Sequence, residues 1–221
     1  ICAVDLGINT DAVCSIMKAD GTILARKFID FTSDKDRMIH TMNRTRRKQS
    51  KYGPKSTRGL WAYVKRLNED RAKKISAAIV EFASQHSVDA IVMEHLDFKG
   101  CKKRGSKAQR LSMWNHGIIR EKVEQKAHLL GIRIATICAW KTSALAFDGS
   151  GSVTRDDNNH ALATFTTGKQ YNCDLSASYN IGARYFIREL LKSLPATEES
   201  RVKAKVPDAG RRTSCTLSTL R

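Results

Sequence analysis

The order of the apolar segments restricts the fold of this chain more than any other feature. Residues 1–30 contain three consecutive strand-like runs, with Asp20 and Gly21 at a hairpin turn between the second and the third. From Leu60 onward, helix-like apolar periodicity alternates with strand-like runs. The order is therefore three strands, helix, strand, helix, strand, insert and helix. This order predicts an α/β fold, in which a mixed sheet carries helices on both faces.

The segments also suggest an organisation. We expect a sheet-and-helix unit at 1–140 with a basic helical segment at 31–87, a β-hairpin insert at 141–173, a final helix at 174–194 and a basic tail at 196–221. The tail is polar, and its composition predicts disorder. The chain opens directly on a strand and has no initiator Met, so we interpret it as the C-terminal part of a longer protein.

The charge of the chain indicates its class of partner. Its 221 residues include 39 Lys or Arg and 22 Asp or Glu, giving a formal net charge of +17. Such an excess favours a polyanionic partner, most often nucleic acid. No run of about 18 apolar residues is present, so no membrane span is expected. The six cysteines form no CxxC pair and fit neither a disulfide framework nor a zinc ribbon.

The positive charge is concentrated in two segments. Residues 41–74 carry twelve Lys or Arg against two acids, and residues 99–110 carry six and no acid. A solvated helix face would mix the two signs, whereas a surface that follows a phosphate backbone needs one sign. The predicted nucleic-acid-binding residues are Arg44, Arg46, Arg47, Lys48, Lys51, Lys55, Arg58, Lys102, Lys103, Arg104, Lys107 and Arg110.

Three acids stand in or beside apolar segments. Asp5 lies in the first strand-like run, Glu94 ends the run Ala90–Met93, and Asp174 opens the final helix. Singly, each has an ordinary explanation: a strand-end residue, a solvated edge and a helix N-cap. Together they indicate a site, because the first and fourth strands of such a sheet can be neighbours and the helix start can pack against them.

Three neighbouring carboxylates repel one another unless cations hold them. Two Mg²⁺ ions would do so, and they would also clamp the attacking and leaving oxygens of a phosphodiester. Mg²⁺ prefers a few carboxylates together with waters and phosphate oxygens. The three acids therefore favour metal-dependent phosphodiester hydrolysis.

The same acids lie in segments that resemble a known family: AVDLGIN at 3–9, IVMEHL at 91–96 and DLSASYNIG at 174–182. These look like the three split motifs of the RuvC nuclease domain in TnpB (OrfB) proteins of bacterial insertion sequences and in related compact type V CRISPR effectors. The likeness covers roughly residues 1–190. It implies an RNase H-like fold and an RNA-guided, Mg²⁺-dependent DNA endonuclease.

The resemblance also assigns roles and partners. By motif position, the catalytic and metal-binding residues would be Asp5, Glu94 and Asp174, holding two Mg²⁺ ions for which Mn²⁺ can substitute. The partners would be a DNA substrate and a guide RNA, the latter bound mostly by a preceding N-terminal part. The location would be the prokaryotic cytoplasm, in association with the nucleoid.

The insert departs from the family pattern. Many TnpB proteins carry a four-cysteine zinc ribbon between the second and third motifs. Here the corresponding positions fall near Ala146, Gly149, Thr167 and Gln170, none of which is a zinc ligand. Zinc is therefore not expected, and we interpret the insert as a metal-free remnant held by hydrogen bonds and packing.

Two alternatives to a guided nuclease stay open at this point. One is an RNA-guided DNA-binding protein that has lost cleavage, against which the three retained acids argue. The other is a different RNase H-fold nuclease, such as a resolvase or a DNA-strand transferase. The sequence does not distinguish a transposon nuclease from a CRISPR effector, and it does not give the oligomeric state.

Overall fold

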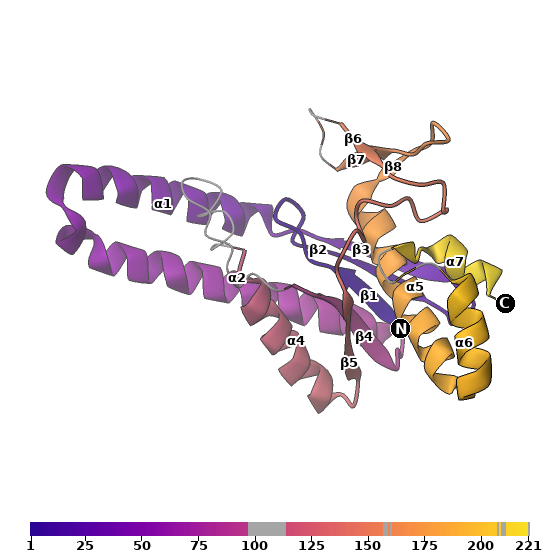
Figure 1. The fold of residues 1–221 in the computed structure, drawn as a ribbon. Coiled ribbons are helices and arrows are strands. Elements are labelled where there is room, and N and C mark those ends of the chain that lie inside the picture. The colour runs from indigo at the N-terminus through magenta and orange to yellow at the C-terminus, as the bar shows by residue number, and fades with distance from the viewer. Residues whose placement is uncertain (97–113, 157–158, 160, 207, 209–210, 221) are drawn as a thin grey trace.

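The computed structural model of the protein describes residues 1–96, 114–156, 159, 161–206, 208 and 211–220 (Figure 1). A five-stranded sheet in the order β3-β2-β1-β4-β5 forms its centre. The strands are β1 (Cys2–Asp5), β2 (Ala12–Met17), β3 (Ile23–Ile29), β4 (Ala90–His95) and β5 (Arg133–Cys138). β1 pairs antiparallel with β2 and parallel with β4, so the sheet is mixed, as the sequence predicts.

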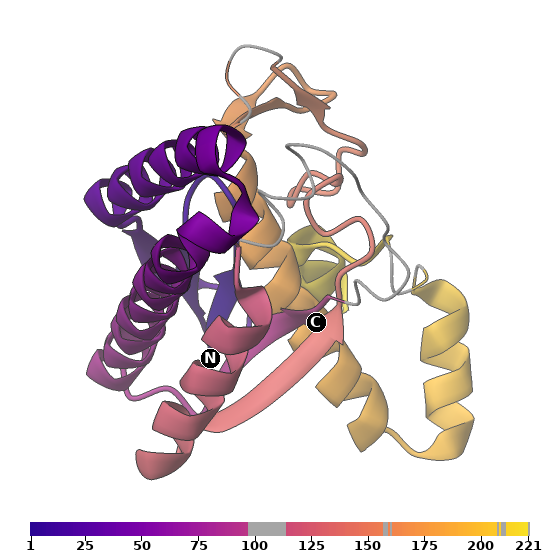
Figure 2. The same cartoon turned by 90° about the vertical axis from the view of Figure 1, so that its left-hand side faces the viewer.

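Helices cover both faces of this sheet (Figure 2). α2 (Arg58–Gln85) and α4 (His116–Leu129) pack on one face, and α5 (Cys173–Ser193) packs on the other. The larger core lies under α2 and α4 and includes Ile75, Ile79 and Val123. No helix in the described ranges is long and apolar enough to cross a lipid bilayer.

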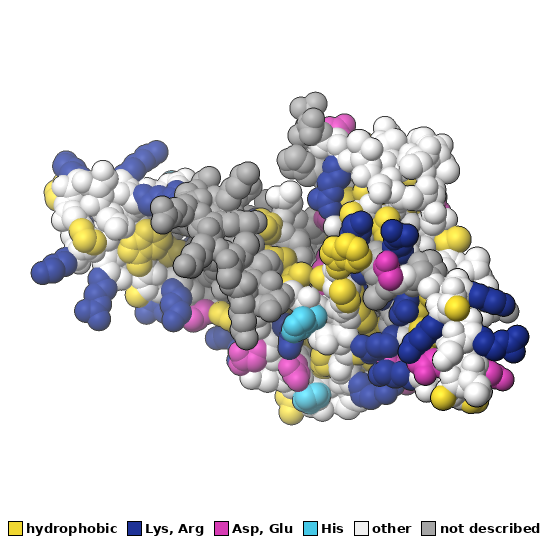
Figure 3. All heavy atoms as spheres, in the orientation of Figure 1, with side chains coloured by type: hydrophobic (Ala, Val, Ile, Leu, Met, Phe, Trp, Pro, Cys, Tyr) yellow, Lys and Arg dark blue, Asp and Glu magenta, His cyan; other side chains and the backbone are white. Residues whose placement is uncertain are grey.

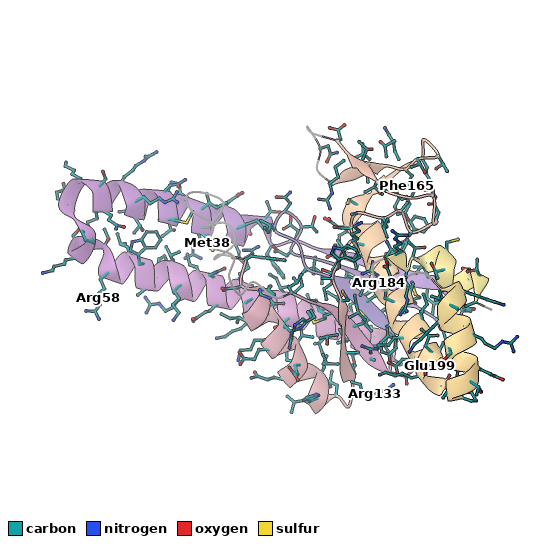
Figure 4. All side chains as sticks on the ribbon, in the orientation of Figure 1. Met38, Arg58, Arg133, Phe165, Arg184 and Glu199 are labelled. Atoms are coloured by element: carbon teal, nitrogen blue, oxygen red, sulfur yellow. The ribbon has the colours of Figure 1, made fainter. Side chains whose placement is uncertain are left out.

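The basic helical segment at 31–87 forms a long helical hairpin that projects from the sheet (Figure 1). α1 (Thr32–Tyr52) is joined to α2 by a short 3₁₀ helix, Pro54–Thr57. Gly53 turns the chain with a φ of 82°, a conformation that favours glycine. Met38 is buried between the two helices (Figure 4), and the indole N–H of Trp61 donates to Gln49 Oε1 at 2.8 Å.

The insert contains one more strand than predicted. β6 (Thr154–Arg155), β7 (Leu162–Thr164) and β8 (Gln170–Asn172) form a three-stranded antiparallel sheet, whereas the sequence predicts a simple hairpin. A small core of its own supports it, made mainly by Phe147, Phe165 and Tyr171. The third strand was missed because strands of two or three residues give little alternation to detect.

The prediction of a disordered tail is wrong for most of its described residues. α6 (Ala196–Lys205) and α7 (Ser214–Thr219) both lie against α5. Leu217 is almost fully buried in the α5 core, and the Arg184 side chain donates to the Arg212 carbonyl at 3.1 Å. These contacts reach back about thirty residues, so the composition of the tail alone does not reveal them.

Candidate active site

Asp5 and Glu94 lie at the same end of the two central strands. β1 and β4 run parallel, with Val4 opposite Met93, and one further step of this register sets Asp5 beside Glu94. The residues before both acids are fully buried, so the core fixes both strand ends. The expectation that the first and fourth strands are neighbours is confirmed.

Asp174 lies in the first turn of α5, but it does not cap the helix. The N-cap is Asn172, whose side chain accepts a hydrogen bond from the Leu175 N–H at 2.8 Å. The interpretation of Asp174 as an N-cap is therefore wrong. A carboxylate in the first turn is stabilised by the helix dipole, and Asp174 is not needed to close the end of the helix.

Small residues let α5 approach the sheet closely enough to bring Asp174 to this point. A Cβ atom on Gly182 would lie 2.9 Å from Met17 Sδ and 3.3 Å from Ala3 Cβ, both too close for unchanged packing. Ala177 and Ser178 are also fully buried. The spacing of small residues in the segment DLSASYNIG thus reflects how close the helix lies to β1 and β2.

The three acids line one cavity of about 500 Å³, which we call the carboxylate cavity. The strand ends and α5 form one part of its wall, and the loop after β1, Leu6–Asn9, forms another. Its remaining lining residues are Trp114, Ser143, Arg155 and Ala161. Three segments far apart in the sequence are therefore brought to one open, polar site.

Asp5 is the middle member of the three carboxylates. Burial raises its pKa well above the ordinary value, and the charges of Glu94 and Asp174 raise it further, while Arg155 opposes the shift. Both other acids thus act on Asp5. A carboxylate in this position gains from any cation that enters the cavity.

The other two acids also have raised pKa values, and each has a hydroxyl partner. Burial raises the pKa of Glu94 against the hydrogen bond from Thr142 and the charge of Arg184. Burial likewise raises the pKa of Asp174 against the charge of Arg155 and a hydrogen bond with Thr10. In each case burial outweighs the favourable contacts, which is typical of acids kept for a function.

Thr142 is itself held in place by α5. Its hydroxyl donates to Glu94 Oε1, and its carbonyl accepts a hydrogen bond from the Asn180 amide at 3.0 Å. The same amide donates to the Leu145 carbonyl at 2.9 Å, and Asn180 Oδ1 accepts from the Ser214 N–H at 3.2 Å. One buried side chain thus ties the start of the insert and the tail to the helix that carries Asp174.

A second buried acid stands close by in the chain, with its charge fully paired. Asp11 accepts hydrogen bonds from the Arg71 guanidinium and from the Phe31 N–H, and Lys35 Nζ lies 3.2 Å from its Oδ1. Burial alone would raise its pKa, but these partners outweigh burial and lower it. The cluster joins the first turn of α1 and the middle of α2 to the loop that ends at Asp11.

This loop connects the paired acid with the carboxylate cavity. The Lys35 ammonium group also donates to the Asn9 carbonyl, and Thr10, the next residue, bonds to Asp174. A Cβ atom on Gly7 would lie 2.5 Å from the Thr10 carbonyl oxygen, so the turn requires glycine there. The helical hairpin is therefore linked to the cavity through three consecutive loop residues, Asn9, Thr10 and Asp11.

The donor set suits Mg²⁺ in one particular way. Among the described residues, no three Asp, Glu, His or Cys side chains are placed to enclose a single metal ion. Mg²⁺ does not need such an enclosure, because it is bound through one or two carboxylates, with waters or phosphate oxygens completing the octahedron.

Sequence reasoning missed three residues at this site. Arg155 comes from the exposed strand β6, and its charge lowers the pKa values of both Asp5 and Asp174. Thr10 and Thr142 bond to two of the acids. Their local sequence does not predict these contacts, because each residue reaches the site through long-range packing.

The predicted nucleic-acid-binding residues that the structure describes lie at the far end of the helical hairpin. They are all exposed and form no ion pair within the described ranges: Arg44, Arg46, Arg47, Lys48, Lys51, Lys55 and Arg58. Figure 3 shows Lys and Arg side chains projecting from this end, and Figure 4 shows Arg58 at the start of α2.

Other members of the two basic segments lie elsewhere. Lys102, Lys103, Arg104, Lys107 and Arg110 fall outside the described residues. Arg71 belongs to the basic segment 41–74 but is buried against Asp11, so it serves the fold rather than the surface.

The fold has solved relatives, although the sequence matches no protein-family model and no curated protein. A cryo-EM structure of a Cas12f1–sgRNA–target DNA complex is similar with a TM-score of 0.61 and 19% identity, covering 82% of this chain and 49% of that chain. A cryo-EM structure of a CRISPR–Cas12f ternary complex gives 0.57 and 17%, covering 82% and 38%. The chain therefore spans about half or less of these proteins and shares their fold over that part.

Proposed function

We propose that this chain is the nuclease part of an RNA-guided DNA endonuclease with an RNase H-like, RuvC-type fold. Asp5, Glu94 and Asp174 are its catalytic carboxylates. One observation carries the proposal: three acids from distant segments meet in one cavity, and each has a raised pKa. Acids arranged in this way repel one another, which is unfavourable for stability and suits a cation-dependent reaction.

The cofactor in this proposal is Mg²⁺, for which Mn²⁺ can substitute. Asp5, Glu94 and Asp174, which line the carboxylate cavity, would hold the metal. When bound, the ions lower the pKa of an attacking water and stabilise the charge that develops on the leaving oxygen. No side chain then has to act as the nucleophile.

The surrounding residues orient the carboxylates and the substrate. Thr142 and Thr10 each fix one acid by a hydrogen bond, so these acids turn toward the cavity in a defined way. Arg155 borders the same cavity and carries a positive charge. Its position suits contact with a phosphate oxygen of the strand being cut, because a guanidinium binds phosphate well.

The helical hairpin supplies the surface that binds nucleic acid. Its seven exposed, unpaired cations lie at its far end and face solvent (Figure 3). Such contacts bind the phosphate backbone and fix the register without reading bases. Guidance by RNA is proposed because the fold resembles that of a protein solved with sgRNA and target DNA.

Cleavage with matched variants tests the proposed site. The measurement is the rate of DNA cutting by the protein, with its copurifying RNA, in Mg²⁺ and in EDTA. We expect Asp174→Asn to slow cutting on the order of 10³-fold, because it removes one of the three proposed metal-binding carboxylates. Asp36→Asn changes an exposed aspartate on α1 and is the control. Undiminished cutting by Asp174→Asn, or cutting in EDTA, would contradict the proposal.

A second experiment tests DNA binding separately from DNA cleavage. The triple variant Arg46→Ala, Arg47→Ala and Lys48→Ala should weaken binding to all DNA sequences alike. The slope of log K against log salt should fall by about 2–3, because three phosphate contacts are lost. Binding is measured by fluorescence anisotropy at several salt concentrations, and a loss confined to one DNA sequence would contradict a backbone grip.

A further inference from the structure

A second cavity, of about 620 Å³, lies on the other side of the segment that begins the insert. We call it the tail cavity, because α7 and the end of α6 form much of its wall. Its principal lining residues are Lys141, Leu145, Lys205, Val206, Arg211 and Thr213. It is larger than the carboxylate cavity, and its volume lies in the usual range for ligand sites.

The charge of the tail cavity is of one sign. Lys141, Lys205 and Arg211 are all exposed, and none of the described lining residues is acidic. Arg211 Nε lies 3.7 Å from Asp208 Oδ2, but both side chains are mostly exposed, so this pair is weak. Neither lysine forms an ion pair within the described ranges. Lys and Arg side chains also gather over and around α6 (Figure 3).

An exposed aromatic side chain stands beside one of these cations, Lys141. Trp140 is 57% exposed, and Lys141 Nζ lies 4.7 Å from the centre of its ring. Exposed tryptophan next to lysine and arginine is the combination by which single-stranded nucleic acids are held, with bases stacked and phosphates paired. Leu145 and Val206 add an apolar part to the wall.

The backbone beside the tail cavity is strained and firmly held. Lys141 has a φ of 58°, in the left-handed region that is unfavourable for a side chain of this kind. Arg184 fixes this turn, because its Nη1 donates to the carbonyls of Cys138 and Trp140, both at 2.8 Å. Strain maintained by a buried arginine indicates that the positions of Trp140 and Lys141 have a function.

The two cavities share one segment of chain. Ser143 lines the carboxylate cavity, whereas Lys141 and Leu145 line the tail cavity. Alternate residues of a single short stretch therefore face the two sites. The two cavities therefore lie on either side of this stretch of chain.

We propose that the tail cavity binds a nucleotide of single-stranded DNA that neighbours the bond being cut. Lys141, Lys205 and Arg211 hold its phosphate, and Trp140 stacks on a base, so binding does not depend on sequence. The identity of the strand rests on the proposed nuclease function. The binding site itself rests only on the charge, the aromatic residue and the cavity.

Binding of labelled oligothymidylate in EDTA tests this site without any cutting. The variant Lys141→Ala, Lys205→Ala, Arg211→Ala should bind at least about 10-fold more weakly, with a salt slope lower by about 2. Trp140→Ala should cost about 5- to 100-fold. Oligothymidylate should also quench the tryptophan fluorescence of the unaltered chain, and Trp140→Phe should remove most of that quench.

The control removes the same charge from another part of the surface: Lys122→Ala, Lys126→Ala, Arg133→Ala. Equal losses in both triple variants, an unchanged quench with Trp140→Phe, or tighter binding of single-stranded RNA through the same residues would overturn the proposal. Because no metal is present, the result is independent of catalysis. If Asp174→Asn still cut DNA, the nuclease assignment would fail while this binding site stood.

Discussion

Asp5 and Asp11 are six positions apart, and the protein treats them in opposite ways. Asp11 is buried and paired with Arg71 and Lys35, and its pKa is lowered. Asp5 is enclosed at the wall of the carboxylate cavity beside two further acids, and its pKa is raised. The same side chain is thus a structural anchor at one position and a source of repulsion at the other.

The contrast shows which of the two acids stabilises the fold and which destabilises it. Arg71 comes from α2, sixty residues away, and supplies the charge that Asp11 needs. No comparable partner is bonded to Asp5 within the described ranges; Arg155 acts on it only through its charge. A buried acid without a bonded cation persists where function requires it, whereas a paired one holds segments together.

The largest expected effect comes from neutralising each acid in turn. Asp5→Asn should slow cleavage on the order of 10³-fold and raise the free energy of unfolding by about 1 kcal/mol, because it removes repulsion with Glu94 and Asp174. Asp11→Asn should lower that free energy by about 3 kcal/mol, because it leaves Arg71 buried without its partner. Urea unfolding and cleavage rates check both, and stability changes of the same sign would remove the contrast.

The pH dependence should separate the two acids with opposite signs. The lowered pKa of Asp11 stabilises the fold above the ordinary value of 3.8, and this contribution is lost as the pH falls through the lowered value. The raised pKa of Asp5 works the other way: its contribution is full below 3.8 and is lost as the pH rises through the raised value.

Melting temperatures in metal-free buffer between about pH 2 and 8 measure this contrast, because the Asp11 contribution is lost only below about pH 4. The advantage of Asp5→Asn over the unaltered protein should grow as the pH rises, and the deficit of Asp11→Asn should shrink as the pH falls. Added Mg²⁺ should stabilise the unaltered protein and Asp11→Asn, but not Asp5→Asn. A pH-independent difference for Asp5→Asn would show that its carboxylate does not repel its neighbours.

The smallest expected effect concerns Thr10, which stands between the two acids. Thr10→Val keeps the shape of the side chain but removes the hydrogen bond to Asp174. We expect a loss of about 1 kcal/mol or less in stability and a two- to tenfold slower cleavage. Thr41→Val removes a hydroxyl that bonds within α1, so it is the matched control, and an equal effect of both variants would contradict a role for the loop.

The sequence predicts the parts of this molecule that depend on local pattern. The order of strands and helices follows from apolar periodicity. The meeting of Asp5 with Glu94 follows from that order, because a parallel neighbour of β1 ends at the same edge of the sheet. The placement of Asp174 required only that the last helix pack on the opposite face.

The sequence does not predict contacts that join distant segments. The pairing of Asp11 with Arg71 spans sixty residues, and the hydrogen bonds of Asn180 span more than thirty. The choice of Asn172 over Asp174 as N-cap depends on two residues of helix register, which periodicity does not fix. The tail cavity arises only because a polar tail packs on α5.

The position of Asp174 on α5 has a consequence during protein synthesis. Asp5 and Glu94 can come together once β4 has emerged from the ribosome, but the third carboxylate follows 80 residues after Glu94. At about 5–20 residues per second, this delay is about 4–16 s. A nascent chain therefore carries an incomplete set of acids, and the carboxylate cavity is complete only after α5 has been made and has docked on the sheet.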